Sequence, residues 1–118
     1  MAVEEGEVGR FGDLEDRARS GDGLTPNHIP QTALAHLPHR DHAAVMMSHA
    51  DHLLTRTYGS KGRRTKRLDA GLSFRQVLAK DLWDLRKIGQ DVYGDAGHFN
   101  PQIKGIMQYY RTNYPHLL

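Results

Sequence analysis

Two short histidine stretches hold the residues best suited to chemistry, one at residues 25–31 and the other at residues 47–59. In the first, Pro26 and Pro30 flank His28 and disfavour helix between them. We therefore expect an extended or looped backbone that presents the His28 side chain. An imidazole titrates near neutral pH, which suits a general base. These features make His28 a candidate proton acceptor, although a histidine beside proline can also simply cap a turn.

The second stretch has the start of a helix. Ser48 is a preferred N-cap residue, so we predict a helix that begins at His49. Residues one turn apart on a helix lie on one face, so His49, His52 and Thr55 are expected to share a face. His52 is the candidate metal ligand and catalytic residue, with His49 as a candidate catalytic residue beside it. The alternative is that His52 is an ordinary surface residue of this helix.

The absence of cysteine restricts the chemistry of the chain. Disulfides, thiolate zinc sites and cysteine nucleophiles are excluded, so a metal would be held by His, Asp, Asn or Glu. The amide oxygen of Asn27 and the carboxylate of Asp22 are available to complete a ligand set with His52. One divalent ion beside a general base is suited to phosphodiester hydrolysis.

Positive charge is concentrated in the middle of the chain, although the net charge is only +2. Residues 59–71 contain three glycines and five basic residues without an apolar pattern, which predicts an exposed, mobile loop. Its position directly after the candidate ligand helix favours contact with a nucleic-acid backbone over a merely solvated role. The candidate nucleic-acid-binding residues are Arg56, Lys61, Arg63, Arg64, Lys66 and Arg67.

The remaining pattern predicts an α+β fold that is mostly helical. Residues 43–47 form an apolar run typical of a buried strand, and residues 12–20 suit one or two helical turns. A short helix is expected to begin with Pro30 at its first position and to run to His36. Apolar spacing and capping signals predict a helix from Phe74 to Gly89, and a second from Asn100 to about Asn113.

We expect two segments of different character. Residues 1–21 should be a flexible or weakly ordered lead-in, and residues 22–118 should form one domain. The other histidines lack a shared periodicity, so we expect them on solvated turns or loops outside the site. They are His36, His39, His42, His98 and His116.

The two histidine motifs resemble the HNH/endonuclease VII superfamily. The closer resemblance is to the nuclease toxin domains at the C-termini of bacterial polymorphic toxins and secretion-system effectors. The matching segments are residues 27–31 and 45–59, and residues 74–86 resemble the helical tail of those domains. The likeness covers roughly residues 22–115, of which the two histidine motifs are chemically diagnostic.

This resemblance implies a small ββα-metal, HNH-like core with a C-terminal helical pair. His28 matches the catalytic histidine of the family, and His52 matches the helix-borne ligand. Asn27 stands where the family typically has Asp or His, and it is a weaker ligand than either. Ser48 and His49 occupy the place of the middle residue of the HNH triplet.

The implied function is that of a metal-dependent DNA endonuclease that uses Mg²⁺, Mn²⁺, Ni²⁺ or Zn²⁺. It would act as an antibacterial toxin, delivered within a larger effector into the target cytoplasm, with a cognate immunity protein as partner. The alternatives are a metal-independent RNase and a non-catalytic nucleic-acid-binding module of the same fold. No apolar run approaches the length of about 20 residues that spans a bilayer, and the acidic start differs from a signal peptide. We expect a monomer without membrane contact.

Overall fold

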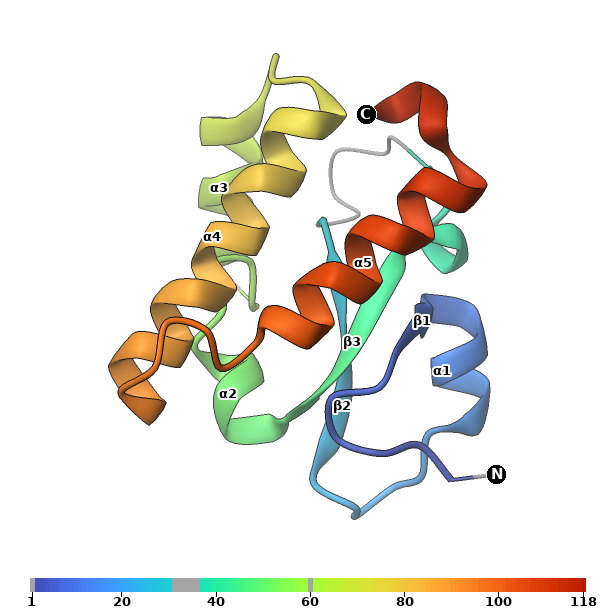
Figure 1. Ribbon diagram of the computed structural model, residues 1–118, viewed down its shortest axis with the longest axis vertical. Coiled ribbons are helices and arrows are strands. Elements are labelled where there is room, and N and C mark those ends of the chain that lie inside the picture. The colour runs from blue at the N-terminus through green and yellow to red at the C-terminus, as the bar shows by residue number, and fades with distance from the viewer. Residues whose placement is uncertain (1, 31–36, 60) are drawn as a thin grey trace.

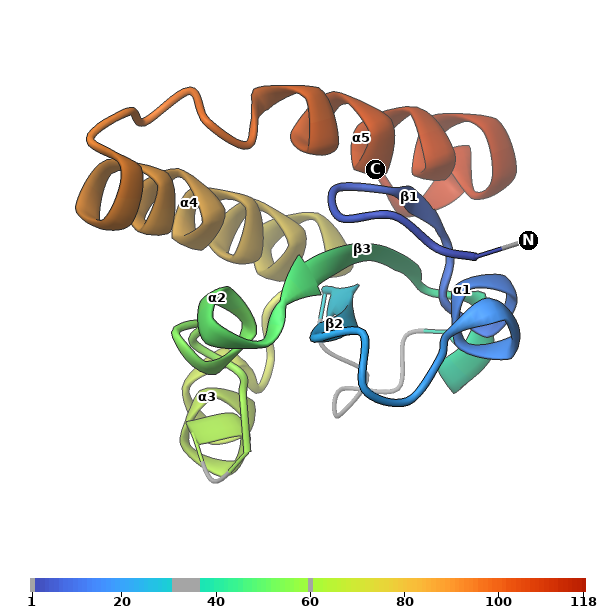
Figure 2. The ribbon, with the colours of Figure 1, turned by 90° about the horizontal axis from the view of Figure 1, so that it is seen from below.

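An antiparallel sheet with helices on both faces organises the molecule (Figures 1 and 2). The computed structural model describes residues 2–30, 37–59 and 61–118, and within these the sheet has three strands in the order β1-β3-β2. The architecture is therefore α+β and mostly helical, as predicted. The elements are β1 (Val8–Arg10), α1 (Phe11–Arg17), β2 (Leu24–Ile29), the 3-10 turn η2 (His39–Asp41), β3 (Ala43–Ser48), α2 (His49–Leu53), α3 (Lys61–Asp69), α4 (Phe74–Tyr93), α5 (Asn100–Asn113) and the 3-10 turn η3 (Pro115–Leu117).

The central strand β3 is buried on both faces. Its odd-numbered residues, such as Val45, belong to a core that includes residues of α4 and α5. Its even-numbered residues, such as Met46, belong to a second core with Phe11 and Leu14 of α1. Alternate side chains of a strand point to opposite faces, so a strand covered on both sides needs an unbroken apolar run. This confirms the predicted buried strand and explains why it lacks polar alternation.

Helices α4 and α5 form the predicted C-terminal helical pair. The capping box of α4 is present, because Ser73 and Gln76 exchange side-chain to backbone hydrogen bonds. The expected end at Gly89 is wrong, since α4 continues to Tyr93 and ends at Gly94, whose φ of 69° is left-handed. Gly89 lies inside the helix, where a Cβ would approach the carbonyl oxygen of Asp95 to 2.7 Å. It is a packing glycine rather than a cap.

The N-terminal segment belongs to the fold. Residues 8–10 were expected in a weakly ordered lead-in, but they form β1 and pair with β3. Helical turns were expected within residues 12–20 and are confirmed as part of α1. Val3, Phe11 and Leu14 are buried against the second face of the sheet. The expectation of weak order is therefore wrong for these residues, because they cover apolar side chains of β3.

Helix α3 replaces the predicted mobile loop at residues 59–71. Its inner face carries Thr65 and Asp69, which lie one turn apart and are both buried. The helix forms despite a very polar sequence because this face is anchored to the rest of the molecule. Of the short helix predicted from Pro30 to His36, Pro30 lies in a bend after β2, and residues 31–36 lie outside the described residues. Nowhere in the described ranges is there a helix long and apolar enough to cross a membrane.

Candidate functional site

The site is built on a hairpin and the helix that follows it. Strand β2 pairs with β3 in an antiparallel register, and α2 starts directly after β3. The Ser48 hydroxyl accepts a hydrogen bond from the Asp51 backbone N–H, which confirms the predicted N-cap. Because α2 begins at this end of β3, it lies beside the beginning of β2. There, Thr25 Oγ1 of β2 lies 2.6 Å from His52 Nδ1 of α2.

His52 is half-buried and packed on one side by an aromatic ring. The Tyr58 ring lies edge-on at 4.9 Å between centroids. Burial lowers the pKa of His52, and the neighbouring His49 lowers it further. A neutral ring results, with Nδ1 held by Thr25. Among the described residues, Nε2 has no hydrogen-bond partner and is available to a ligand.

Asn27 and His28 are neighbours in sequence but face opposite sides of the sheet. Asn27 is buried, and its amide Nδ2 donates to Met47 Sδ at 3.4 Å. This contact lies on the side of the sheet that α4 and α5 cover. His28 instead stacks on Phe11 of α1, with ring centroids 3.6 Å apart. This follows from the alternation of side chains along a strand. Asn27 therefore lies on the same face of β2 as Thr25, which is two residues earlier in the strand.

His28 is the most strongly perturbed group of the site. Burial lowers its pKa to about 3, and repulsion from His39, His42 and His52 contributes further. Its Nε2 is enclosed and has no hydrogen-bond partner among the described residues. The His39 ring lies 4.3 Å from the His28 ring between centroids. His28 is thus a neutral imidazole at physiological pH, and its enclosed Nε2 makes no hydrogen bond to a described residue.

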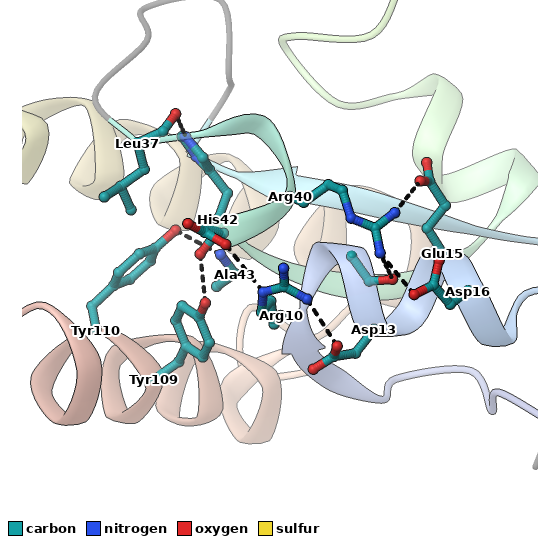
Figure 3. A network of polar contacts seen from close by, with 12 residues as sticks. Arg10, Asp13, Glu15, Asp16, Leu37, Arg40, His42, Ala43, Tyr109 and Tyr110 are labelled. Atoms are coloured by element: carbon teal, nitrogen blue, oxygen red, sulfur yellow. Dashed lines mark hydrogen bonds and ion pairs between the residues drawn. The ribbon is translucent and has the colours of Figure 1, made fainter.

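Ion pairs hold in place the two side chains that cover His28, which are Phe11 of α1 and His39 of η2. Arg40 of η2 bonds to Glu15 at 3.1 Å and to Asp16 at 2.7 Å, both on α1 (Figure 3). Arg10, next to α1, bonds to Asp41 of η2 at 3.1 Å. These contacts fasten α1 to η2, and so keep Phe11 and His39 against His28.

Two histidines that we expected on solvated turns contribute to this region. His39 is exposed but contacts the His28 ring. His42 is fully buried, which contradicts the expectation, and its ring nitrogens lie 3.0 Å from the Pro30 carbonyl oxygen and 3.1 Å from that of Leu37. Burial is possible because one of these carbonyl oxygens can accept the single N–H of a neutral ring.

The other three histidines left out of the site differ in what the structure describes. His98 is exposed in the α4–α5 loop and stacks on Tyr93, and His116 is exposed in η3. Both therefore lie where expected. His36 is outside the described residues.

The structure brings some of the other candidate site residues near α2 together. Asp22, Thr25 and His49 line one open hollow on the surface. The Asp22 carboxylate accepts a hydrogen bond from the Leu24 backbone N–H at 2.9 Å. Thr55 does not share a face with the two histidines of α2. The helix ends at Leu53, and Thr55 is buried with its hydroxyl donating to the His52 carbonyl oxygen.

The donor set can be compared with the needs of a divalent metal. His52 has one nitrogen fixed by Thr25 and the other unbonded within the described residues, which is the usual state of a metal-binding histidine. Asn27 lies on the same face of β2. No group of three or more His, Asp, Glu or Cys side chains is placed to hold an ion in the described ranges. A divalent ion held by His52 would therefore need most of its ligands from water or phosphate oxygens.

Arg56 is separated from the other basic candidates. Its guanidinium bonds to Asp81 at 2.6 Å and to Asp69 at 2.8 Å, and its backbone N–H donates to Asp84. Lys80 also pairs with Asp69. Since these carboxylates already hold the guanidinium, the structure places Arg56 in a network between α3 and α4 rather than on a nucleic-acid surface.

The basic side chains of α3 point away from the anchored face. Lys61 is exposed, and its Nζ bonds to the Leu53 carbonyl oxygen at 2.8 Å. The other four are exposed on the outer side of the helix, and together they form a cationic surface next to α2. They are Arg63, Arg64, Lys66 and Arg67.

Comparison with known proteins adds no relative. No family model matches the chain, and neither the curated proteins nor the solved structures give a significant match. The resemblance to HNH nucleases therefore rests on the sequence motifs alone.

Sequence reasoning missed three residues of this geometry. Thr25 lies within the first motif, but nothing in its spacing links it to His52. Phe11 and His39 reach His28 only through the packing of α1 and η2. A signal for Thr25 was available in hindsight, since a histidine that binds a metal needs a partner for its second nitrogen.

Proposed function

We propose that the chain is a metal-dependent endonuclease that hydrolyses DNA, with an HNH-like core formed by β2, β3 and α2. The observation that carries this proposal is the contact between Thr25 and His52. It joins the strand that bears Asn27 and His28 to the helix that bears the candidate ligand. The order hairpin then helix, with these residues on it, is the arrangement that the motif resemblance implies.

The cationic surface of α3 supports a polyanionic substrate. Four exposed basic side chains follow the candidate ligand helix directly, and each can neutralise a phosphate. Backbone contacts of this kind position a duplex but do not read its sequence. We therefore propose a nuclease with little sequence preference.

His28 supplies the general base in this proposal. The folded ring is neutral, but a pKa of about 3 makes it a weak base while it is enclosed, so substrate binding has to expose Nε2 and raise this pKa before it takes a proton from the attacking water. Because His28 and Asn27 face opposite sides of β2, both can serve one phosphate only if substrate binding moves the exposed His39 aside and opens the enclosed Nε2 at this strand. His52 and Asn27 would hold the divalent ion, with Asp22 and His49 at the edge of the same region. When bound, the ion supplies positive charge that stabilises the phosphate in the transition state.

The biological setting follows from the resemblance alone. As a toxin domain, the chain would act in the cytoplasm of a target cell after delivery by a larger effector. The producing cell would need an immunity protein, for which an acidic face complementary to α3 is the expected chemistry.

A metal-independent RNase is the second candidate. The observation that favours it is the contact between His28 and His39, because two imidazoles can share the roles of base and acid when the 2′-OH is the nucleophile. A non-catalytic binding module has weaker support, since it leaves the enclosed nitrogen of His28 without a role.

Incubation with supercoiled plasmid tests the proposal. The purified protein should nick plasmid with at least one of Mg²⁺, Mn²⁺, Ni²⁺ or Zn²⁺ and should be inactive in chelator. His28→Ala and His52→Ala should each reduce the rate by roughly 100-fold or more, while the exposed His116→Ala should cut like the wild type. Intact plasmid under all metal conditions would refute the DNase. Cleavage of RNA in chelator would then select the RNase.

A further inference from the structure

Thr25 occupies an unusual position for a residue of a paired strand. Its backbone is fixed by pairing with Met47 of β3, and its hydroxyl makes the ring contact to His52 on another element. A β-branched side chain has few χ1 rotamers, so the hydroxyl position is well defined. The Tyr58 ring packs edge-on against the same imidazole. Thr25 and Tyr58 together restrict how the His52 ring can turn.

The contact allows two arrangements of the proton. Either His52 Nδ1–H donates to the Thr25 oxygen, or the Thr25 hydroxyl donates to an unprotonated Nδ1. A neutral imidazole has only one N–H, so this choice decides whether Nε2 carries a lone pair or a proton. His52 Nε2 makes no hydrogen bond to another described residue that would satisfy an N–H. The first arrangement satisfies the one N–H of the ring inside the protein.

We propose that Thr25 is a positioning residue that holds His52 as the Nδ1–H tautomer and thereby presents the Nε2 lone pair to a divalent cation. This inference rests on the proposed function, because the cation is part of it. Thr25 itself does not touch the substrate. Its role is to keep one nitrogen of His52 available as a ligand.

The tautomer can be measured without metal or nucleic acid. In ¹⁵N-labelled protein, imidazole nitrogen shifts should show His52 with a protonated Nδ1 and an unprotonated Nε2. Thr25→Ser keeps the hydroxyl and should retain this state, whereas Thr25→Val keeps the shape of the side chain and should lose the preference. An Nε2–H tautomer in the wild type, or an unchanged tautomer in Thr25→Val, overturns the proposal.

Calorimetric titration with Zn²⁺ provides the second readout. Thr25→Val should bind Zn²⁺ roughly 10- to 100-fold more weakly than the wild type, the usual effect of losing the partner of a ligating histidine. Thr25→Ser should stay close to the wild type, and His52→Ala should lose this binding. Equal affinity of Thr25→Val and the wild type contradicts the positioning role. A protein with the expected tautomer and Zn²⁺ affinity that leaves plasmid and RNA intact counts against the proposed function alone.

Discussion

At the scale of single residues, His28 is expected to make stability depend on pH. An unfolded histidine takes up a proton near pH 6.5, whereas the folded pKa of His28 is about 3. Between these values the unfolded state binds more protons, so stability is full above the unfolded pKa and falls as the pH falls. The loss from this one group reaches about 1.4 kcal/mol per pH unit. Urea unfolding between about pH 4.5 and 8 measures it.

The difference between wild type and His28→Leu isolates this contribution. The variant should lose less stability on acidification, because leucine takes up no proton. His116→Leu changes an exposed histidine and should keep the wild-type slope. Parallel curves for wild type and His28→Leu would show that His28 is not held neutral by burial.

The residue types of the site were predictable, but their contacts were not. His28 and His52 stand out in the sequence because each sits beside a clear local signal, a proline pair and an N-cap. His39 carries no such signal, and it reaches His28 only because Arg40 fastens η2 to α1. The burial that lowers the pKa of His28 likewise depends on Phe11, 17 positions away in the sequence.

At the scale of elements, α3 should bind nucleic acid through its outer face. Replacing Arg63, Lys66 and Arg67 together by Gln should weaken binding to duplexes of any sequence. It should also lower the slope of log affinity against log salt by about 0.9 for each phosphate that the variant no longer neutralises. Fluorescence anisotropy with a labelled duplex at several salt concentrations measures both. An unchanged salt slope would exclude α3 as the contact surface.

Arg56→Gln is the matched control for the α3 variant. It removes one positive charge, but from the network with Asp69 and Asp81. It should therefore lower the free energy of unfolding, on the order of 3 kcal/mol. At temperatures where the variant is folded, it should leave the salt slope of binding close to that of the wild type.

The helices that could be predicted from the sequence are those with local signals, whereas α3 depends on tertiary contacts. Helices α4 and α5 have apolar periodicity and capping signals, and both were expected within a few residues of their bounds. Helix α3 has no apolar stripe, and its inner face is held by Thr65 and by the ion pairs of Asp69. Tertiary contacts of this kind are invisible to local pattern reasoning.

At the scale of the whole molecule, the N-terminal segment should be essential for folding. Deletion of residues 2–17 removes β1 and α1, and exposes the face of β3 that carries Met46. We expect the truncated chain to lose cooperative urea unfolding. The milder change Phe11→Ala should cost about 3 kcal/mol because Phe11 is buried. A truncated protein with a wild-type unfolding curve would show that the segment is dispensable.

The central position of β3 also has a consequence for folding during synthesis. Strands β1 and β2 each pair with β3, which follows both of them in the chain. Neither strand has its partner until the ribosome has made residue 48. The Tyr110 hydroxyl of α5 then bonds to both the Ile29 carbonyl oxygen and the Ala43 N–H. Because these non-local contacts come late, the chain is expected to complete its fold only after its last long helix has left the ribosome.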